Sequence, residues 1–138
     1  MGRIVGIDYG TKRVGLAVTD PLKIISSPMD TIHSKDVIEF LKKYHEREVI
    51  EAFAVGMPKN TDNQPTNATP HVKVFVKHLR KAFPNIPIHL IDERFTSKMA
   101  LDVMIAGGTK KKDRREKGNI DKISAAIILQ SYMDSHSI

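Results

Sequence analysis

The chain has 138 residues, of which 41% are hydrophobic and 28% charged, a length and composition that suit one domain covering residues 1–138. It contains no cysteine, which excludes disulfides, thiolate zinc sites and cysteine nucleophiles, and no apolar run near the ~20 residues of a membrane span, so we expect a cytoplasmic protein. The formal net charge of +6 at pH 7 favours a polyanionic partner such as nucleic acid.

The first predicted elements form a hairpin. Residues 4–7 are almost wholly apolar, as in a strand covered on both faces, and they end in Asp8; residues 14–18 can pair back antiparallel. The turn between them carries a hydroxyl and two cations, those of Thr11, Lys12 and Arg13. A strand-end carboxylate beside basic groups suits a divalent metal held against a phosphate. Asp8 could instead simply accept backbone N–H bonds in the turn.

The next elements indicate a mixed α/β domain. Residues 24–32 predict a third strand, with Pro28 at an edge position or at the start of the strand, so that three N-terminal strands form a meander. Ser34 is a fair N-cap for a helix that reaches about Arg47. The strand predicted at residues 51–56 should lie parallel to the first strand, because a helix precedes it.

A second helix and strand follow a long connection. Residues 56–70 contain three prolines and no apolar period, which predicts a loop at the carboxyl end of a parallel strand, where open α/β sheets place ligand sites; a plain connection explains the stretch equally well. Residues 72–83 have the apolar spacing of a helix, and residues 86–91 that of a strand. Asp92 and Glu93 therefore stand where a buried strand stops.

Residues 96–118 predict a short helix and then a basic run. Thr96 or Ser97 is expected to cap the helix, which ends near Ala106. The following run holds six cations against two acids, and it favours a nucleic-acid contact, although such runs are more often solvated loops. The cations are Lys110, Lys111, Lys112, Arg114, Arg115 and Lys117.

The last predicted helix runs from Ile120 or Asp121 to Ser135. Its apolar residues continue most of the way round, so we expect it to be well covered. Asp121 falls in its first turn, on the same face as the small residues Ser124 and Ala125, which would let this end approach the sheet closely. The alternative for Asp121 is an N-cap or a partner of the helix dipole, worth about 1 kcal/mol.

Three carboxylates, those of Asp8, Glu93 and Asp121, thus stand at the edges of apolar elements and are expected on one side of the sheet. Clustered carboxylates repel one another, and Mg²⁺ or Mn²⁺ would relieve that repulsion. Oxygen ligands fit these cations better than zinc, and the six histidines show no ligand spacing.

Four motifs together resemble the YqgF family, in matching order along the whole chain. They are residues 6–17 (GIDYGTKRVGLA), 55–58 (VGMP), 92–97 (DERFTS) and 121–129 (DKISAAIIL). Proteins of this family were first labelled Holliday junction resolvases and are now regarded as nucleases that process the 5′ end of precursor 16S ribosomal RNA. The resemblance implies an α/β ribonuclease H-like fold: a five-stranded mixed sheet with strands 1–3 antiparallel, strands 4 and 5 parallel to strand 1, and helices on both faces.

The resemblance also implies a catalytic site. Asp8, Glu93 and Asp121 would be the catalytic residues and would ligate one or two Mg²⁺ or Mn²⁺ ions that position water for in-line attack on a phosphodiester. Asp92 is the alternative to Glu93, because strand alternation lets only one of two neighbours face the metal. Thr11, Lys12 and Arg13 would hold phosphate, and Arg94 would orient Glu93 or contact the RNA backbone. The phosphates along the nucleic-acid strand would be bound by Lys59, Lys110, Lys111, Lys112, Arg114, Arg115 and Lys117.

Other functions fit parts of the same pattern. Branched DNA is the alternative substrate to precursor rRNA, and a non-catalytic RNA-binding or assembly protein would explain the basic charge without cleavage. Asp8, Gly10 and Thr11 also resemble the phosphate loop of the actin and sugar-kinase superfamily, but the chain is too short for that superfamily's second lobe. No membrane contact is expected, and the protein should be a monomer or a weak homodimer.

Overall fold

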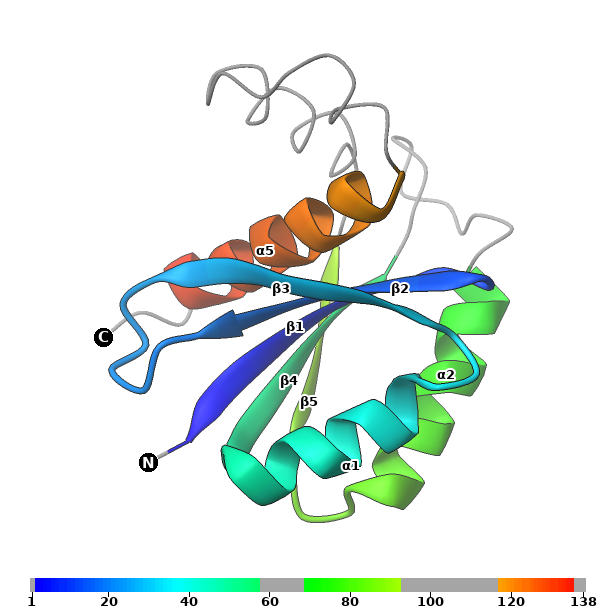
Figure 1. Ribbon diagram of the computed structural model, residues 1–138, viewed down its shortest axis with the longest axis horizontal. Helices are drawn as coiled ribbons and strands as arrows, with labels where there is room; N and C mark the ends of the chain where they lie inside the picture. Colours follow the sequence, from blue (N-terminus) through cyan, green and yellow to red (C-terminus); the bar gives the residue numbers. More distant parts are fainter. Residues whose placement is uncertain (1, 58–68, 93–116, 136–138) are drawn as a thin grey trace.

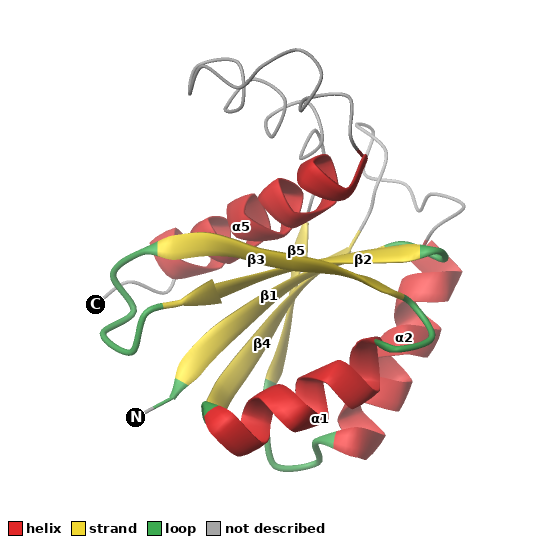
Figure 2. Cartoon of the chain, viewed as in Figure 1, coloured by secondary structure: helices red, strands yellow, loops and turns green. Residues whose placement is uncertain are grey.

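The computed structural model describes residues 2–57, 69–92 and 117–135, which form a five-stranded sheet with helices on both faces (Figures 1 and 2). The helix expected near residues 96–106 lies outside the described residues. None of the described helices is long and apolar enough to cross a membrane. The strands are β1 (Arg3–Tyr9), β2 (Arg13–Thr19), β3 (Ser26–His33), β4 (Ile50–Met57) and β5 (Ile88–Asp92), and the helices are α1 (Val37–Arg47), α2 (Thr69–Ala82) and α5 (Lys117–Ser135).

The pairing of the strands confirms the predicted sheet. The strand order is β3-β2-β1-β4-β5, with antiparallel pairs β1–β2 and β2–β3 and parallel pairs β1–β4 and β4–β5. Pro28 lies on the edge strand β3, where the register with β2 shifts between Leu16 and Ala17. The carboxyl ends of β1, β4 and β5 therefore meet at one edge of the sheet, as open α/β sheets require for a ligand site.

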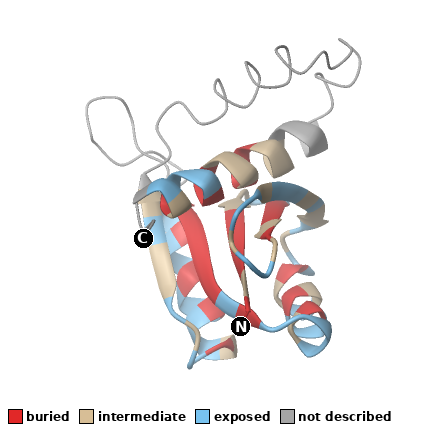
Figure 3. Ribbon diagram, turned by 90° about the vertical axis from the view of Figure 1, so that its left-hand side faces the viewer, coloured by how far each residue is buried: buried red, intermediate tan, exposed pale blue. Residues whose placement is uncertain are grey.

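The two faces of the sheet carry side chains of different size. Under α1 and α2, the buried cluster contains large residues such as Phe53, Leu16 and Leu41, with no exposed surface. Under α5, the buried sheet residues are mostly small, including Ala17, Ala52 and Ala54. Figure 3 shows the buried positions at the centre of the sheet. Because small side chains leave room for a backbone, α5 can lie closer to the sheet than a helix above large side chains.

Two predicted helix starts were wrong. Asp36, not Ser34, is the N-cap of α1, because the Ser34 hydroxyl instead donates a 2.6 Å hydrogen bond to the carbonyl oxygen of Thr11. Helix α5 begins at Lys117, so Asp121 lies in its second turn and is neither an N-cap nor a first-turn residue. The prediction assigned the basic run up to residue 118 to a loop because it is polar and flanked by glycines, but the helix already includes residues 117–120.

Helix α5 is covered on one side among the described residues. Its sheet-facing residues Ala125, Ile128 and Leu129 are buried, whereas Ile123 and Ile127 are half-buried. The prediction of a well-covered helix is therefore right for the face toward the sheet.

A buried hydrogen bond from β1 to the Thr19 side chain of β2 can be tested by substitution. This residue is 1% exposed, and its Oγ1 accepts a 2.9 Å hydrogen bond from the Ile4 backbone N–H, beside the register shift between β1 and β4. We expect Thr19→Val to cost about 1–3 kcal/mol in the free energy of unfolding, because it leaves a buried N–H without an acceptor. Urea unfolding measures this cost. Thr19→Ser keeps the hydroxyl and is the matched control; an equal loss in both variants would contradict the role of the hydrogen bond.

Candidate active site

Asp8 lies at the carboxyl end of β1 and faces α5. Its neighbours Ile7 and Tyr9 pack into the cluster under α1 and α2, and side chains alternate along a strand, so Asp8 lies on the opposite face, as Gly6 does. Directly across the β1–β2 pair stands Gly15. The half-buried Asp8 thus has a residue without a side chain as its cross-strand neighbour on the α5 face.

Glycine at these positions lets the helix approach. A Cβ atom on Gly15 would overlap the backbone carbonyl of Asp121, and one on Gly6 would lie 2.7 Å from both the carbonyl oxygen of Ala125 and the Cβ of Leu129. Real Cβ atoms do not occupy such positions, so side chains here would force α5 away from the sheet. The contact at Gly15 places the Asp121 turn of α5 against the strand pair that carries Asp8, which brings together two of the three predicted acids.

Arg13 binds Asp121 in this arrangement. Its Nε donates a 3.0 Å hydrogen bond to Oδ2 of Asp121, with side-chain exposed fractions of 42% and 25%, respectively. Arg13 lies two residues before Gly15 in β2, hence on the same face of the strand. A predicted phosphate ligand and a predicted metal ligand therefore contact each other directly.

The turn between β1 and β2 is held by the chain itself. The Gly10 N–H donates to the carbonyl oxygen of Arg13 at 2.9 Å. From the β3–α1 connection, Ser34 bonds the turn twice, through its N–H to the Lys12 carbonyl at 3.1 Å and through its hydroxyl to the Thr11 carbonyl. The Thr11 and Lys12 side chains are exposed, so the backbone of the turn is bonded while its polar groups remain available to a ligand. Sequence reasoning missed Ser34 because a serine before a helix is typical of an N-cap.

The donor chemistry of the described site fits a hard divalent cation. Among residues 2–57, 69–92 and 117–135, no three His, Cys, Asp or Glu side chains form a group that could hold a metal. Asp8 and Asp121 nevertheless supply carboxylate oxygens from adjacent elements, and oxygen ligands are those that Mg²⁺ and Mn²⁺ prefer. One turn after Asp121, the buried Ser124 hydroxyl has no hydrogen-bond partner in the described part of the chain.

Most other predicted ligands fall elsewhere. Lys117 begins α5 and Asp92 ends β5, but their side chains are not among those described. The remaining predicted residues lie outside the described residues: Lys59, Glu93, Arg94, Lys110, Lys111, Lys112, Arg114 and Arg115.

A family model described as "RuvX: Holliday junction resolvase" matches residues 2–135. The chain belongs to this family. Among curated relatives, a protein of Christiangramia forsetii named "Putative pre-16S rRNA nuclease" is 49% identical over 96% of this chain and 98% of its own length. One of Parabacteroides distasonis with the same name is 47% identical over 98% of this chain and 96% of its own. The resemblance to the YqgF family is thereby confirmed, and the RuvX-family chain is a nuclease that hydrolyses phosphodiester bonds.

Solved structures confirm the ribonuclease H-like fold. Thermus thermophilus RuvC in complex with a Holliday junction superposes with a TM-score of 0.60 and 16% identity, over 99% of this chain and 97% of RuvC. The fowlpox virus resolvase bound to Holliday junction DNA gives 0.60 and 15%, over 99% of both chains. At this level of identity, the likeness establishes that the RuvX-family chain shares their fold.

Gly15→Ala tests whether the helix contact places the acid. The added Cβ should move the Asp121 turn away from β1, and a misplacement of about 1 Å can cost roughly 100-fold in rate. We expect kcat for phosphodiester hydrolysis to fall by about that factor, measured well below the melting temperature. Gly2→Ala adds the same group just before β1, at the end away from Asp8, where a Cβ would lie 2.9 Å from the carbonyl oxygen of Val49; it is the control, since both variants should lose about 1–3 kcal/mol of stability. Equal kcat values in the two variants would contradict a positional role for Gly15.

Proposed function

We propose that this RuvX-family nuclease cleaves precursor 16S rRNA at its 5′ end during ribosome biogenesis, in the cytoplasm, by metal-dependent hydrolysis. The observation that carries the proposal is the packing of the Asp121 turn against Gly15, opposite Asp8. Relatives of nearly equal length named as pre-16S rRNA nucleases support this choice of substrate.

We assign the metal ligands to Asp8, Glu93 and Asp121, with Mg²⁺ or Mn²⁺ as the ion. The register supports Glu93 over Asp92: Ile91 packs into the cluster under α5 and His89 contacts Tyr132 of α5, so alternate positions of β5 face that helix. Continuing the alternation by two positions favours residue 93 as the second acid. When bound, the ion would stabilise charge on the phosphate and lower the pKa of attacking water.

The chain's own residues have distinct parts in this proposal. Arg13 pairs with Asp121 at 3.0 Å and so compensates its charge when no metal is bound, and in this proposal it contacts the scissile phosphate. Thr11 and Lys12 project from a turn held by Ser34 and would bind the neighbouring phosphate. Arg94 would orient Glu93 or contact RNA. The RNA sugar-phosphate backbone would be bound by Lys59, Lys110, Lys111, Lys112, Arg114, Arg115 and Lys117.

Branched DNA is the second candidate substrate, because the description of the matching family names a Holliday junction resolvase. The same preparation should therefore be offered a labelled precursor rRNA and a four-way DNA junction, each with and without Mg²⁺. Cleavage of the junction with the RNA left intact would replace the proposed substrate. Binding of RNA without any cleavage would instead indicate a non-catalytic RNA-binding protein.

Asp8→Asn should abolish Mg²⁺-dependent cleavage of precursor rRNA while preserving the fold and RNA binding, since the amide keeps the shape of the side chain but is a poor ligand for Mg²⁺. Cleavage is followed on labelled RNA, and binding by fluorescence anisotropy. Asp30→Asn, an exposed acid on the edge strand β3, is the control and should cleave normally. Wild-type cleavage by Asp8→Asn would refute the site.

Arg13→Gln tests the competition between a cation and Arg13 for Asp121. Without the guanidinium, Asp121 should be freer to bind metal, and the Mn²⁺ concentration that half-saturates the thermal-shift response, measured without RNA, should fall several-fold, or about 1 kcal/mol. The KM for RNA should rise, because a phosphate contact is lost. Lys12→Gln removes the same charge from the neighbouring exposed side chain and leaves the Arg13–Asp121 pair in place. If the half-saturating Mn²⁺ concentration falls equally in both variants, the change is explained by net charge alone and competition between Arg13 and the cation is contradicted.

A further inference from the structure

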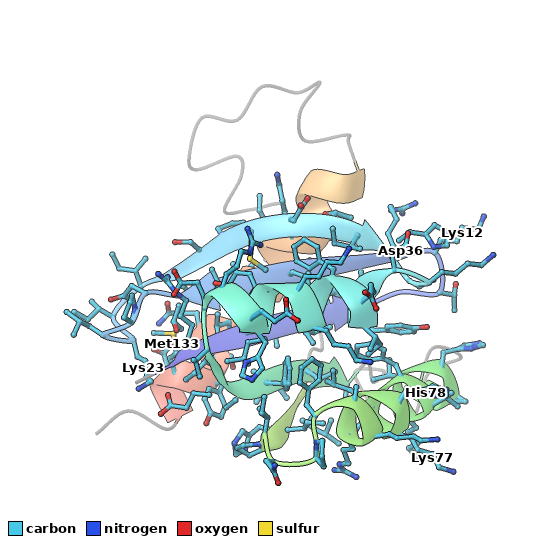
Figure 4. All side chains as sticks on the ribbon, turned by 60° about the horizontal axis from the view of Figure 1, so that its bottom comes forward. Lys12, Lys23, Asp36, Lys77, His78 and Met133 are labelled. Atoms are coloured by element: carbon cyan, nitrogen blue, oxygen red, sulfur yellow. The ribbon has the colours of Figure 1, made fainter. Side chains whose placement is uncertain are left out.

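The exposed face of α2 carries a stripe of positive charge. Lys73, Lys77, Arg80 and Lys81 are all exposed and follow the spacing i, i+4, i+7 and i+8, which places them on one side of a helix. The opposite side of α2 is apolar and packs on the sheet. Figure 4 shows Lys77 pointing away from the sheet, on the same side of the view as Lys12. We call these four residues the α2 stripe.

The stability of the helix does not explain the α2 stripe. Lys73 and Lys77, and Lys77 and Lys81, are like charges four residues apart, and such pairs weaken a helix. Residues 69–82 contain no Asp or Glu to compensate them. The ion pairs among the described residues, Arg3–Glu48, Arg13–Asp121 and Lys23–Glu51, lie on other elements.

The positions of the cations along α2 also show that helix stability does not explain the whole stripe. Arg80 and Lys81 are in the last turn, where the helix dipole favours cations. Lys73 and Lys77 lie before the last turn, where the dipole does not favour a cation. By contrast, α1 alternates its cations with acids, including Glu39 and Glu46. A uniformly basic face is therefore specific to α2 among the two helices on this side of the sheet.

The α2 stripe starts beside the active-site edge of the sheet. Helix α2 connects the carboxyl end of β4 to the start of the parallel strand β5, so it runs antiparallel to the strands (Figure 1). Phe75, in its second turn, stacks on Tyr9 with ring centroids 4.5 Å apart, and Tyr9 directly follows Asp8. From Lys73, in the same turn as Phe75, to Lys81 the stripe spans roughly 12 Å, at about 1.5 Å per residue.

We propose that the α2 stripe binds the sugar-phosphate backbone of the RNA strand as it leaves the cleavage site. The proposal rests on the proposed function, and it adds a binding surface on the face of the sheet opposite α5. A row of exposed cations beside a phosphodiester site is complementary to the regular charge of a nucleic-acid strand. Such contacts position the strand and carry no base preference. The bound strand would thus pass from the turn at Lys12, around the end of β1, onto α2.

The test compares RNA binding by variants with equal charge change, all made in Asp8→Asn so that the RNA stays intact. The stripe variant is Lys73→Gln, Lys77→Gln and Arg80→Gln. The control, on α1, is Lys42→Gln, Lys43→Gln and Arg47→Gln; all six positions are exposed, and Arg47 and Arg80 both lie in the last turns of their helices. Affinity for a labelled single-stranded RNA is measured by anisotropy at several salt concentrations.

We expect the stripe variant to bind roughly 10- to 100-fold more weakly than its parent, and the slope of log K against log salt to become shallower by about 0.7 per lost phosphate contact, or about 2 in all. The control should retain both values. The melting temperature of the stripe variant should be no lower than that of its parent, because the substitutions remove repulsion between like charges. If the triple substitution fails to fold, Lys77→Gln alone should still reduce the slope by about 0.7.

Equal losses in the stripe variant and the control would overturn the proposal, as would parental affinity in the stripe variant. Cleavage of precursor rRNA by the protein with Asp8 intact is scored separately. If the protein cleaves precursor rRNA but the stripe variant binds RNA as its parent does, the proposed function is retained and the proposed role of the α2 stripe is rejected. If the stripe variant binds RNA more weakly and with a shallower salt slope, but the protein with Asp8 intact cleaves no RNA, the α2 stripe is retained as an RNA-binding surface and the proposed function is rejected.

Discussion

The close contact between α5 and the glycines of β1 and β2 is the constraint on which the candidate site depends. A helix can lie against a strand pair at this distance only where no Cβ intervenes, and Gly6 and Gly15 provide that space on two adjacent strands. The contact places Asp121, from near one end of the chain, beside Asp8, from near the other. The same packing buries Ala125 and Leu129, so the apolar burial that stabilises α5 also holds the acid in position.

The two sides of the sheet therefore have different tasks. Large residues such as Phe53 and Leu41 fill the space under α1 and α2, where burial supplies most of the core. Alanines and glycines line the side under α5, which gives up apolar volume for a close approach. Asp8, Asp121 and Arg13 lie on this thinner side, at the edge where the parallel strands end. Since Arg13 and Asp121 are partly exposed, their ion pair contributes little stability and can be exchanged for other partners.

Positive charge around the site follows the same division. Arg13 contacts an acid inside the site, Lys12 projects from the turn, and the α2 stripe begins across the end of β1. A nuclease needs cations for affinity and anions for metal, and these charges would cancel if they mixed freely. Asp8 and Asp121 lie on the α5 side of the sheet, where Arg13 pairs with Asp121, and the α2 stripe lies on the opposite side.

Much of the fold was present in short-range patterns of the sequence. Apolar runs predicted β1, β2, β4 and β5, and helical spacing predicted α1 and α2, because burial of one face imposes those periods on any chain. Helix α5 was predicted from apolar residues that continue most of the way round it. The structure brings the elements that carry Asp8 and Asp121 together, and the catalytic role of these two residues stays a prediction. Glu93 and the basic run stay predictions.

Only the tertiary structure decided which groups meet. Ser34 was predicted to cap a helix, but it bonds the turn at Thr11 and Lys12 from a distant part of the chain. The pairing of Arg13 with Asp121, 108 residues apart, and the need for glycine at position 15 have no local signal. Periodicity reports whether a residue faces a core, and it carries no information on what lies opposite; that depends on how closely distant elements pack.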